Sequence, residues 1–347
     1  NSSFGVVVGA LDFCPRRRLS YLVIVGSAVG DAVEFAKRAD RGALVALMLE
    51  TGLWAGLLQR PFGRIPGPQE QPDALFIIAT DTEPLAPDPR VAIGVSGAAL
   101  RTGVQAMASL VDGPVYLCQS PGEPLAESQA NLQAVEISGL HPAGLAGTVI
   151  DRVHALHAGG VIWQMGYQDV VSLGRLLDTG ALHQDRIVAL SGPGFASPRL
   201  VRAPMGARLD QMAAHELKPG SWHLMSGSPI SGAESLFLRR THNQVTALPR
   251  HTPKVRPWPW LSEGLRRTLP RATIPTRAVD LAMGPDIPAV ALARALGCGD
   301  VETAQKLGAA ALLEEDVALL AYASGAGPGL ARQLRRVLDQ IEEEAVQ

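Results

Sequence analysis

A glycine-containing turn after a predicted strand is the stretch of this chain whose spacing best suits ligand binding. Gly144 and Gly147 lie in GLHPAGLAGT, residues 139–148. Glycines at the start of a helix let backbone N–H groups approach a phosphate closely. The spacing is not G-x-G-x-x-G, and Pro142 interrupts it, so a structural turn is the more frequent explanation of such a segment. His141, Gly144 and Gly147 are therefore candidate cofactor-binding residues without a complete motif.

Tyr167 and Asp169 are two further candidates, because they open a predicted helix directly after the strand-like run at residues 160–165. A carboxylate in the first turn of a helix interacts favourably with the helix dipole. Asp169 therefore also has a structural explanation that requires no catalysis.

The other polar residues do not assemble into a catalytic or metal-binding motif. His154 and His157 are three residues apart, but no cysteine or carboxylate cluster accompanies them, and the chain has no H-E-x-x-H. His242 could orient a ligand, although a structural histidine is more common. Ser226 and Ser228 lie among glycines without forming the G-x-S-x-G of a nucleophile turn. We therefore assign no catalytic residue and no metal ligand.

The composition indicates a folded protein of more than one domain. The chain has 347 residues, of which 47% are hydrophobic and 18% charged, and its net charge is −2. This length suits two or three domains, and the small charge argues against a nucleic-acid-binding surface. The three cysteines lie far apart and form no C-x-x-C, as expected in a reducing cytoplasm. No apolar run approaches the ~20 residues of a transmembrane helix.

Strands and helices are predicted to alternate in the first half of the chain. The clearest example is a strand at Gly160–Met165, a helix at Tyr167–Leu177 and a strand at Arg186–Leu190. Such a βαβ unit predicts two parallel strands in one sheet. Together with the runs upstream it predicts a three-layer α/β domain. Those runs are strands at Asp73–Thr80, Pro114–Cys118 and Leu132–Ile137, a helical segment over residues 31–58 that Gly52 interrupts, and a helix at Val91–Leu110.

The pattern changes after the Ser-Gly-Pro-Gly turn at residues 191–194. Short strands around one short helix predict a small α+β module such as a β-grasp, and the last part of the chain is helical. The predicted division is 1–27 for two strands, 28–195 for the α/β domain, 196–250 for the β-grasp module, 251–285 for a proline-rich basic connector, and 286–347 for a helical domain.

Several short and rare motifs occur in a characteristic order. They are Thr51-Gly-Leu-Trp54, Arg60-Pro-Phe62, Thr80-Asp-Thr-Glu-Pro-Leu85, Val115-Tyr-Leu-Cys118, His141-Pro-Ala-Gly-Leu145 with Gly147-Thr148, Tyr167-Gln-Asp169, Pro198-Arg-Leu200, Ser226-Gly-Ser228, His242-Asn-Gln-Val245, Asp300-x-x-x-Ala-Gln305 and Glu314-Glu-Asp316. In this order they resemble the A-subunit family of the sodium-translocating NADH:quinone oxidoreductases (Na+-NQR), over about residues 19–347. The resemblance implies an α/β multidomain fold. Its parts would be a Rossmann-like parallel-sheet domain, a ubiquitin-like β-grasp domain of the SLBB type, a C-terminal helical domain and, in residues 1–27, the remnant of a biotinyl/lipoyl-like β domain.

The resemblance also implies that this chain has no cofactor of its own. Relatives in respiratory complex I and in the Rnf complex carry a glycine-rich flavin loop where this chain has GLWAGLLQRPFGRIPG, residues 52–67. Leu57, Leu58 and Gln59 replace glycines there, and their bulky side chains would prevent a close approach of the backbone to a flavin. Those relatives also have clustered cysteines for an iron–sulfur centre where this chain has only Cys298. The flavins, iron–sulfur centres, NADH and ubiquinone that the complex uses would then lie in, or bind to, other subunits.

The leading hypothesis is a non-redox peripheral subunit of a NADH:ubiquinone reductase that exports Na+. It would lie on the cytoplasmic side of the bacterial inner membrane. Its partners would be the other subunits, chiefly the membrane subunits, with ubiquinone as a further candidate ligand and no nucleic acid. Two alternatives stay open. One is a soluble flavin- or nucleotide-dependent oxidoreductase with its site at residues 141–147, and the other is a stand-alone binding module built on the β-grasp segment.

Overall fold

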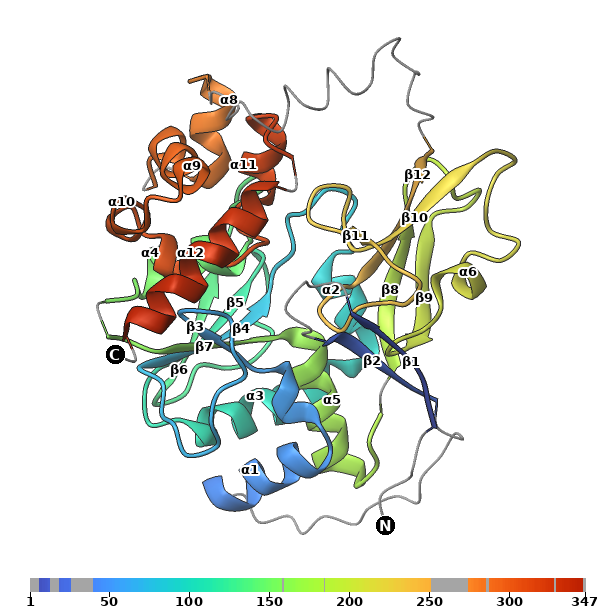
Figure 1. Ribbon diagram of the computed structural model, residues 1–347. Coiled ribbons are helices and arrows are strands. Elements are labelled where there is room, and N and C mark those ends of the chain that lie inside the picture. The colour runs from blue at the N-terminus through green and yellow to red at the C-terminus, as the bar shows by residue number, and fades with distance from the viewer. Residues whose placement is uncertain are drawn as a thin grey trace.

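The computed structural model describes residues 6–12, 19–25, 40–157, 159–183, 185–250, 274–284, 287–327 and 329–345. The chain is a mixed α/β protein with two five-stranded mixed sheets, a separate hairpin and a group of C-terminal helices. Figure 1 shows the C-terminal helices at the upper left and the second sheet at the right, with the first sheet below the helices. In the described part of the chain, no helix is long and apolar enough to cross a membrane.

The first sheet is covered by helices on both faces. Its elements are α1 (Arg41–Glu50), η1 (Leu53–Gly56), β3 (Leu58–Arg60), β4 (Ala74–Ala79), α2 (Pro89–Ile93), α3 (Gly97–Leu110), β5 (Val115–Gln119), β6 (Leu132–Glu136), α4 (Ala146–Val153), β7 (Ile162–Gly166) and α5 (Tyr167–Thr179). The strand order is β3-β7-β4-β5-β6, in which only β3 runs antiparallel to its neighbour. Leu75 and Ile77 pack towards α1, α3 and α5, whereas Phe76 packs towards α4. This alternation follows from the two-residue period of a strand.

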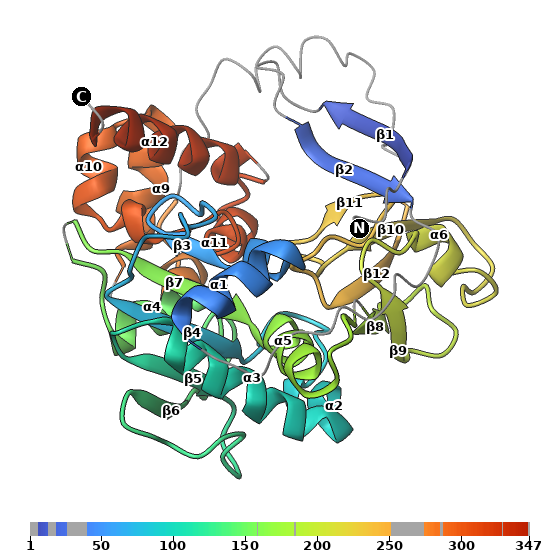
Figure 2. The same ribbon diagram turned by 90° about the horizontal axis from the view of Figure 1, so that it is seen from below.

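The second sheet forms a smaller unit with its own core. Its elements are β8 (Asp185–Ser191), β9 (Arg199–Pro204), α6 (Leu209–Met212), β10 (Trp222–Ser226), β11 (Ala233–Glu234) and β12 (Gln244–Pro249). The strand order is β11-β10-β12-β8-β9, and Figure 2 shows β11 and β9 at the two edges. β8 and β12 are parallel, and the other pairs are antiparallel. The core contains Val188, Phe195, Leu209 and Val245.

The predicted βαβ unit is wrong, because its two strands belong to different sheets. β7 pairs with β3 and β4 in the first sheet, whereas β8 pairs with β9 and β12 in the second. The helix α5 therefore connects the two sheets. A buried strand after a helix satisfies the βαβ pattern whichever sheet it joins. The sheet is decided by packing partners such as Phe195 and Val245, which lie further along the chain.

Several element limits also differ from the prediction. The helical segment predicted over residues 31–58, of which 31–39 lie outside the described residues, has its helix α1 end at Glu50. The predicted interruption at Gly52 is confirmed, because Gly52 has a φ of 75° that a helix cannot continue. The helix predicted over Val91–Leu110 is divided into α2 and α3 at Gly94, which has a φ of 42°. The sequence prediction did not include β3, β11 or α4.

The two ends of the chain form separate elements. β1 (Val6–Asp12) and β2 (Leu19–Val25) pair antiparallel, which confirms the two strands predicted in residues 1–27. The C-terminal helices are α8 (Arg277–Asp280), α9 (Ala289–Cys298), α10 (Val301–Lys306), α11 (Ala318–Ala323) and α12 (Gly329–Ala345), and they share one apolar core. Residues 251–273 of the predicted connector lie outside the described residues.

Candidate functional site

A cleft of about 1650 Å³ lies between the first sheet, the second sheet and the C-terminal helices. It opens at the carboxyl ends of β4 and β7. The chain continues from β4 to β5 on one side, whereas β7 lies on the other side of β4. These strands therefore form the topological switch point at which open α/β sheets bind ligands. The lining residues at this point are Thr80, Asp81, Glu83, Gly166, Tyr167, Gln168 and Asp169.

Three of the five candidate residues line this cleft. They are Gly144, Tyr167 and Asp169, whereas His141 and Gly147 are not among the lining residues. The phenol of Tyr167 is buried, and this burial raises its pKa.

The carboxylate of Asp316 fills the place where Gly147 could have bound a phosphate. The Gly147 N–H donates to Asp316 Oδ1 at 3.2 Å, and a Cβ at position 147 would lie 2.5 Å from Asp316 Cγ. Asp316 also accepts from the Leu313 N–H at 2.8 Å and from Arg60 Nη1 at 2.6 Å. An acidic side chain is stabilised at the N-terminus of α4 as a phosphate would be. Gly147 therefore serves a contact with the C-terminal helices.

Gly144 is held by the loop that follows β4. Its N–H donates to Thr82 Oγ1 at 3.0 Å, and a Cβ on Gly144 would lie 2.7 Å from Thr82 Cγ2. His141 Nδ1 lies 3.4 Å from the same hydroxyl. Partial burial lowers the pKa of His141, although the charges of Glu83 and Asp316 act in the opposite direction. These contacts hold the turn at residues 141–144 against the loop after β4.

Asp169 joins the two sheets through two arginines. Its Oδ1 accepts from Arg186 Nη2 at 2.6 Å and from Arg240 Nη2 at 3.0 Å. Arg186 lies on β8, and Arg240 lies in the loop before β12. A Cβ on Gly56 would lie 3.0 Å from Asp169 Cγ, so η1 also packs against this group. The predicted position of Asp169 in the first turn of α5 is confirmed, and the sequence did not reveal its arginine partners.

The loop after β4 contributes cleft-lining residues that the sequence prediction did not single out as candidates. Ser231 Oγ donates to Glu83 Oε2 at 2.8 Å, which ties the second sheet to this loop. Burial, together with the charge of Glu83, raises the pKa of Asp81 to about 7. Asp81 therefore changes its charge near neutral pH inside the cleft. The sequence did offer one signal for Asp81 and Glu83, because this acidic segment directly follows a buried strand.

We expect Asp81→Asn to stabilise the protein at alkaline pH. Folding raises the pKa of Asp81 from 3.8 to about 7, so the folded state binds a proton that the unfolded state lacks between these values. The stability that this proton contributes is lost as the pH rises through about 7. The free energy of unfolding of the variant should therefore exceed that of the native protein by ~1–3 kcal/mol at pH 8 and by little at pH 4, since one pKa unit corresponds to ~1.4 kcal/mol.

Urea titrations at the two pH values measure this difference. Asp112→Asn is the matched control, because Asp112 is exposed outside the cleft. An equal gain at both pH values for Asp81→Asn would show that the carboxyl does not titrate as described.

Ser226 and His242 form a buried structural contact. Ser226 Oγ lies 2.9 Å from His242 Nδ1 and accepts from the Arg239 N–H at 3.0 Å. Ser226 has no exposed surface. Burial, and then the charge of Arg239, lowers the pKa of His242 to about 4, so this imidazole is neutral at neutral pH. A substrate could not reach this hydroxyl, and the contact fixes the loop between β10 and β12.

Residues 52–67, the segment compared above with a flavin loop, pack partly into the core of the first sheet. Leu57 is fully buried in the core of the first sheet. A Cβ on Gly56 would lie 2.9 Å from Met165 Cε, so no free space adjoins this glycine on that side. Within the described ranges, no group of three His, Cys, Asp or Glu side chains could hold a metal ion.

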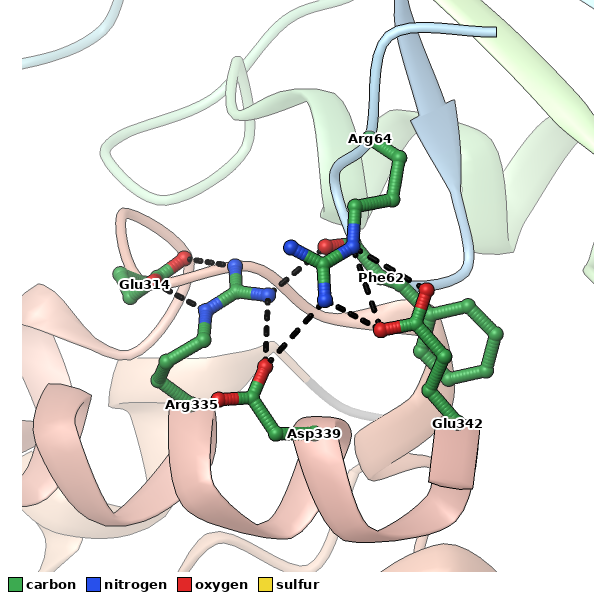
Figure 3. Close-up of polar contacts among 6 residues, drawn as sticks. All are labelled: Phe62, Arg64, Glu314, Arg335, Asp339 and Glu342. Atoms are coloured by element: carbon green, nitrogen blue, oxygen red, sulfur yellow. Dashed lines mark hydrogen bonds and ion pairs between the residues drawn. The ribbon is translucent and has the colours of Figure 1, made fainter. Parts of the chain in front are cut away.

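A polar network fixes the C-terminal helices to the loop after β3. Figure 3 shows Arg64 bound to Glu342 and Asp339, and Arg335 bound to Glu314. Arg335 Nη1 also donates to the Phe62 carbonyl oxygen at 2.7 Å. The fully buried Arg60, on β3, pairs with Asp316 of the segment before α11. One wall of the cleft is thus positioned by contacts between β3 and the C-terminal helices.

The chain is similar to proteins of one family. The family model described as "NqrA second alpha/beta domain" matches residues 39–182, and that described as "NQRA C-terminal domain" matches residues 187–236. The A-subunit of the Na(+)-translocating NADH-quinone reductase of Saccharophagus degradans is 36% identical, and the match covers 97% of this chain and 83% of that relative. The corresponding protein of Pseudomonas aeruginosa is 35% identical, and the match covers 95% and 81%, respectively. A solved NAD+-reducing nickel–iron hydrogenase in the air-oxidized state matches 85% of this chain and 63% of its own, with 12% identity and a TM-score of 0.47.

Proposed function

This chain belongs to the A-subunit family of the Na(+)-translocating NADH-quinone reductases, and from this membership we propose that it is a peripheral, non-redox component of such a complex. The observation that carries the proposal is similarity across 97% of the chain, which includes both sheets and the C-terminal helices. The complex would couple electron transfer from NADH to ubiquinone with Na+ export. The chain would lie on the cytoplasmic side of the membrane, next to the membrane subunits.

Packing at two places supports the non-redox assignment. Asp316 fills the N-terminus of α4, where a nucleotide phosphate could otherwise bind. Gly56 packs against Met165 in the segment that replaces the flavin loop. Both contacts also weigh against the alternative of a nucleotide-dependent oxidoreductase. A contribution to ubiquinone binding stays a prediction, for which the cleft next to Tyr167 is the candidate place.

We propose a Rossmann-like fold for the first-sheet unit and a β-grasp fold for the second-sheet unit. The switch point between β4 and β7 supports the first assignment. In the second sheet the first and last strands are parallel neighbours, and a helix lies between the hairpins, which supports the second. The position of β8 in the second sheet favours a boundary before Asp185. The relation of residues 1–27 to a biotinyl/lipoyl-like domain also stays a proposal.

Purification of the complex through a tag on a different component tests this function. We expect the chain in stoichiometric amount in a complex that reduces ubiquinone with NADH in a Na+-dependent manner. The isolated chain should show no visible absorption and no NADH oxidation. Acid release of stoichiometric flavin from the isolated chain would contradict the non-redox role. Absence of the chain from the purified complex would contradict its role as a component.

A further inference from the structure

One edge of the second sheet opens into the cleft, and β11 covers only part of it. β10 pairs with β12 over its full length, Trp222–Ser226, whereas β11 pairs only with Met225 and Ser226. Among the described residues, no other strand or bridge covers the remaining edge of β10. The uncovered residues Trp222, His223 and Leu224 all line the cleft.

Hydrogen bonds at the two ends of β10 show which backbone groups point towards β12. The Arg250 N–H donates to the Ser221 carbonyl at 3.0 Å, and the Gly227 N–H donates to the Gln244 carbonyl at 2.8 Å. Both pairs continue the register of the β10–β12 ladder. In an antiparallel ladder, only alternate residues bond to the same neighbour. The odd-numbered residues of β10 therefore bond to β12.

The backbone groups of Trp222 and Leu224 consequently point away from β12 and towards the open edge. Pro249 agrees with this alternation. It lies opposite Trp222 and has no N–H to donate to that residue. Two N–H groups and two carbonyl groups thus face the cleft, with no partner strand among the residues that the structure describes. An extended polypeptide satisfies such a row of alternating donors and acceptors, as in β-strand addition.

The two edges of this sheet differ in their protection against strand addition. β9, at the far edge, carries Arg199, Arg202 and Pro204, which are residues that discourage pairing with another chain. Along the other edge, the ionisable side chains on β10 and β11 are His223 and Glu234, whose Nδ1 and Oε1 atoms face each other at 3.5 Å. The edge that faces the cleft is therefore the one left open to pairing.

The size and lining of the cleft also suit a peptide segment. Its volume of about 1650 Å³ exceeds the ~300–1,000 Å³ typical of small-molecule pockets. Two large apolar side chains in its lining are exposed, Leu236 at 61% near β11 and Tyr322 at 75% on α11. Apolar side chains at alternate positions of an added strand could cover such surfaces.

We propose that an extended segment of a partner polypeptide, with apolar side chains at alternate positions, adds to the edge of β10 in the cleft. Its backbone pairs with Trp222 and Leu224 and continues the line of β11 beyond Glu234. The proposal rests on the proposed function in one respect, because the partner is a polypeptide of the same complex.

Residue-level amide hydrogen exchange tests the proposal directly. In the isolated chain, the Trp222 and Leu224 amides should exchange quickly, whereas those of His223 and Met225, which bond to β12, should exchange slowly. In the purified complex, Trp222 and Leu224 should slow by about tenfold or more. Unchanged exchange at these two amides in a complex that contains the chain would overturn the proposal. So would protection confined to Asp81 and its neighbours, which would indicate a small ligand.

A proline at the edge provides a second test. Leu224→Pro removes an N–H that β12 does not use, and strands tolerate proline at such edge positions. Leu224→Ala is the matched control, because it shortens the side chain but keeps the N–H. Recovery of the proline variant with the tagged complex should fall about tenfold relative to the alanine variant, with both isolated variants folded by circular dichroism.

The outcomes of the two tests separate the two proposals. Equal recovery of the two variants would overturn strand addition. If Leu224→Pro does not fold, the exchange measurement on the native chain decides. If the native chain itself is missing from the complex, the proposed function fails. If the chain is present but the edge of β10 stays exposed, only strand addition fails.

Discussion

Arg60→Ala will lower the free energy of unfolding by about 3–5 kcal/mol, because it leaves a buried carboxylate without its counter-ion. Arg60 is fully buried, and its Nη1 donates to Asp316 Oδ2 and to the Ala311 carbonyl, each at 2.6 Å. Its Nε donates to Gln164 Oε1 at 2.7 Å. One guanidinium therefore connects β3, β7 and the segment before α11. Its loss should loosen the C-terminal helices from the first sheet.

The neighbouring Arg64 provides the matched control for this prediction. It binds Glu342 and Asp339 of the same C-terminal helices, but its side chain is 40% exposed. Exposed ion pairs contribute only about 0–1 kcal/mol, so Arg64→Ala should change the stability little. Urea titration and limited proteolysis of the C-terminal helices compare the two variants. Equal effects of the two substitutions would refute the role that we assign to Arg60.

Gly174→Ala will destabilise the first-sheet unit by about 3 kcal/mol or more, because two helices cross at backbone contact there. A Cβ at position 174 would lie 1.7 Å from the Ala99 carbonyl oxygen on α3. Gly103 makes the reciprocal contact, since its Cβ would lie 2.1 Å from the Val170 carbonyl oxygen on α5. Backbone atoms cannot move aside as a flexible side chain can. The variant must separate α3 from α5 and open the core between them.

Gly297→Ala distinguishes this steric effect from helix propensity. Gly297 lies in α9, and nothing lies within 4 Å of the Cβ that it would acquire. Alanine should therefore stabilise α9 by about 0.5–1 kcal/mol. Thermal unfolding of both variants should show opposite shifts. If the Gly174→Ala variant unfolds at the same temperature as the native protein, α3 and α5 are further apart than described.

The sequence alone identified much of the local structure. The apolar runs predicted β4, β5, β6 and β7, and the helical period of the segment after β7 predicted α5. These predictions succeeded because strand and helix periods depend on residues a few positions apart. The family was also identified from short motifs, and the curated relatives confirm it.

The sequence could not assign β8 to its sheet, since that depends on residues that follow it. Nor could it reveal what occupies the Gly144–Gly147 turn. Asp316 lies 169 residues beyond Gly147 and 256 beyond Arg60. No local spacing predicts such contacts. The same reason explains why Asp169 was predicted at the start of a helix, but its partners Arg186 and Arg240 were not.

The sequence by itself thus determined the family, the kinds of elements and most of their order. The tertiary structure alone decided that the apparent phosphate turn holds a carboxylate of the same chain, and that acidic residues after β4 face a cleft. The physical reason is that periodicity and turn propensity act over a few residues. The charges, burial and hydrogen bonds of this site are set by segments that only folding brings together.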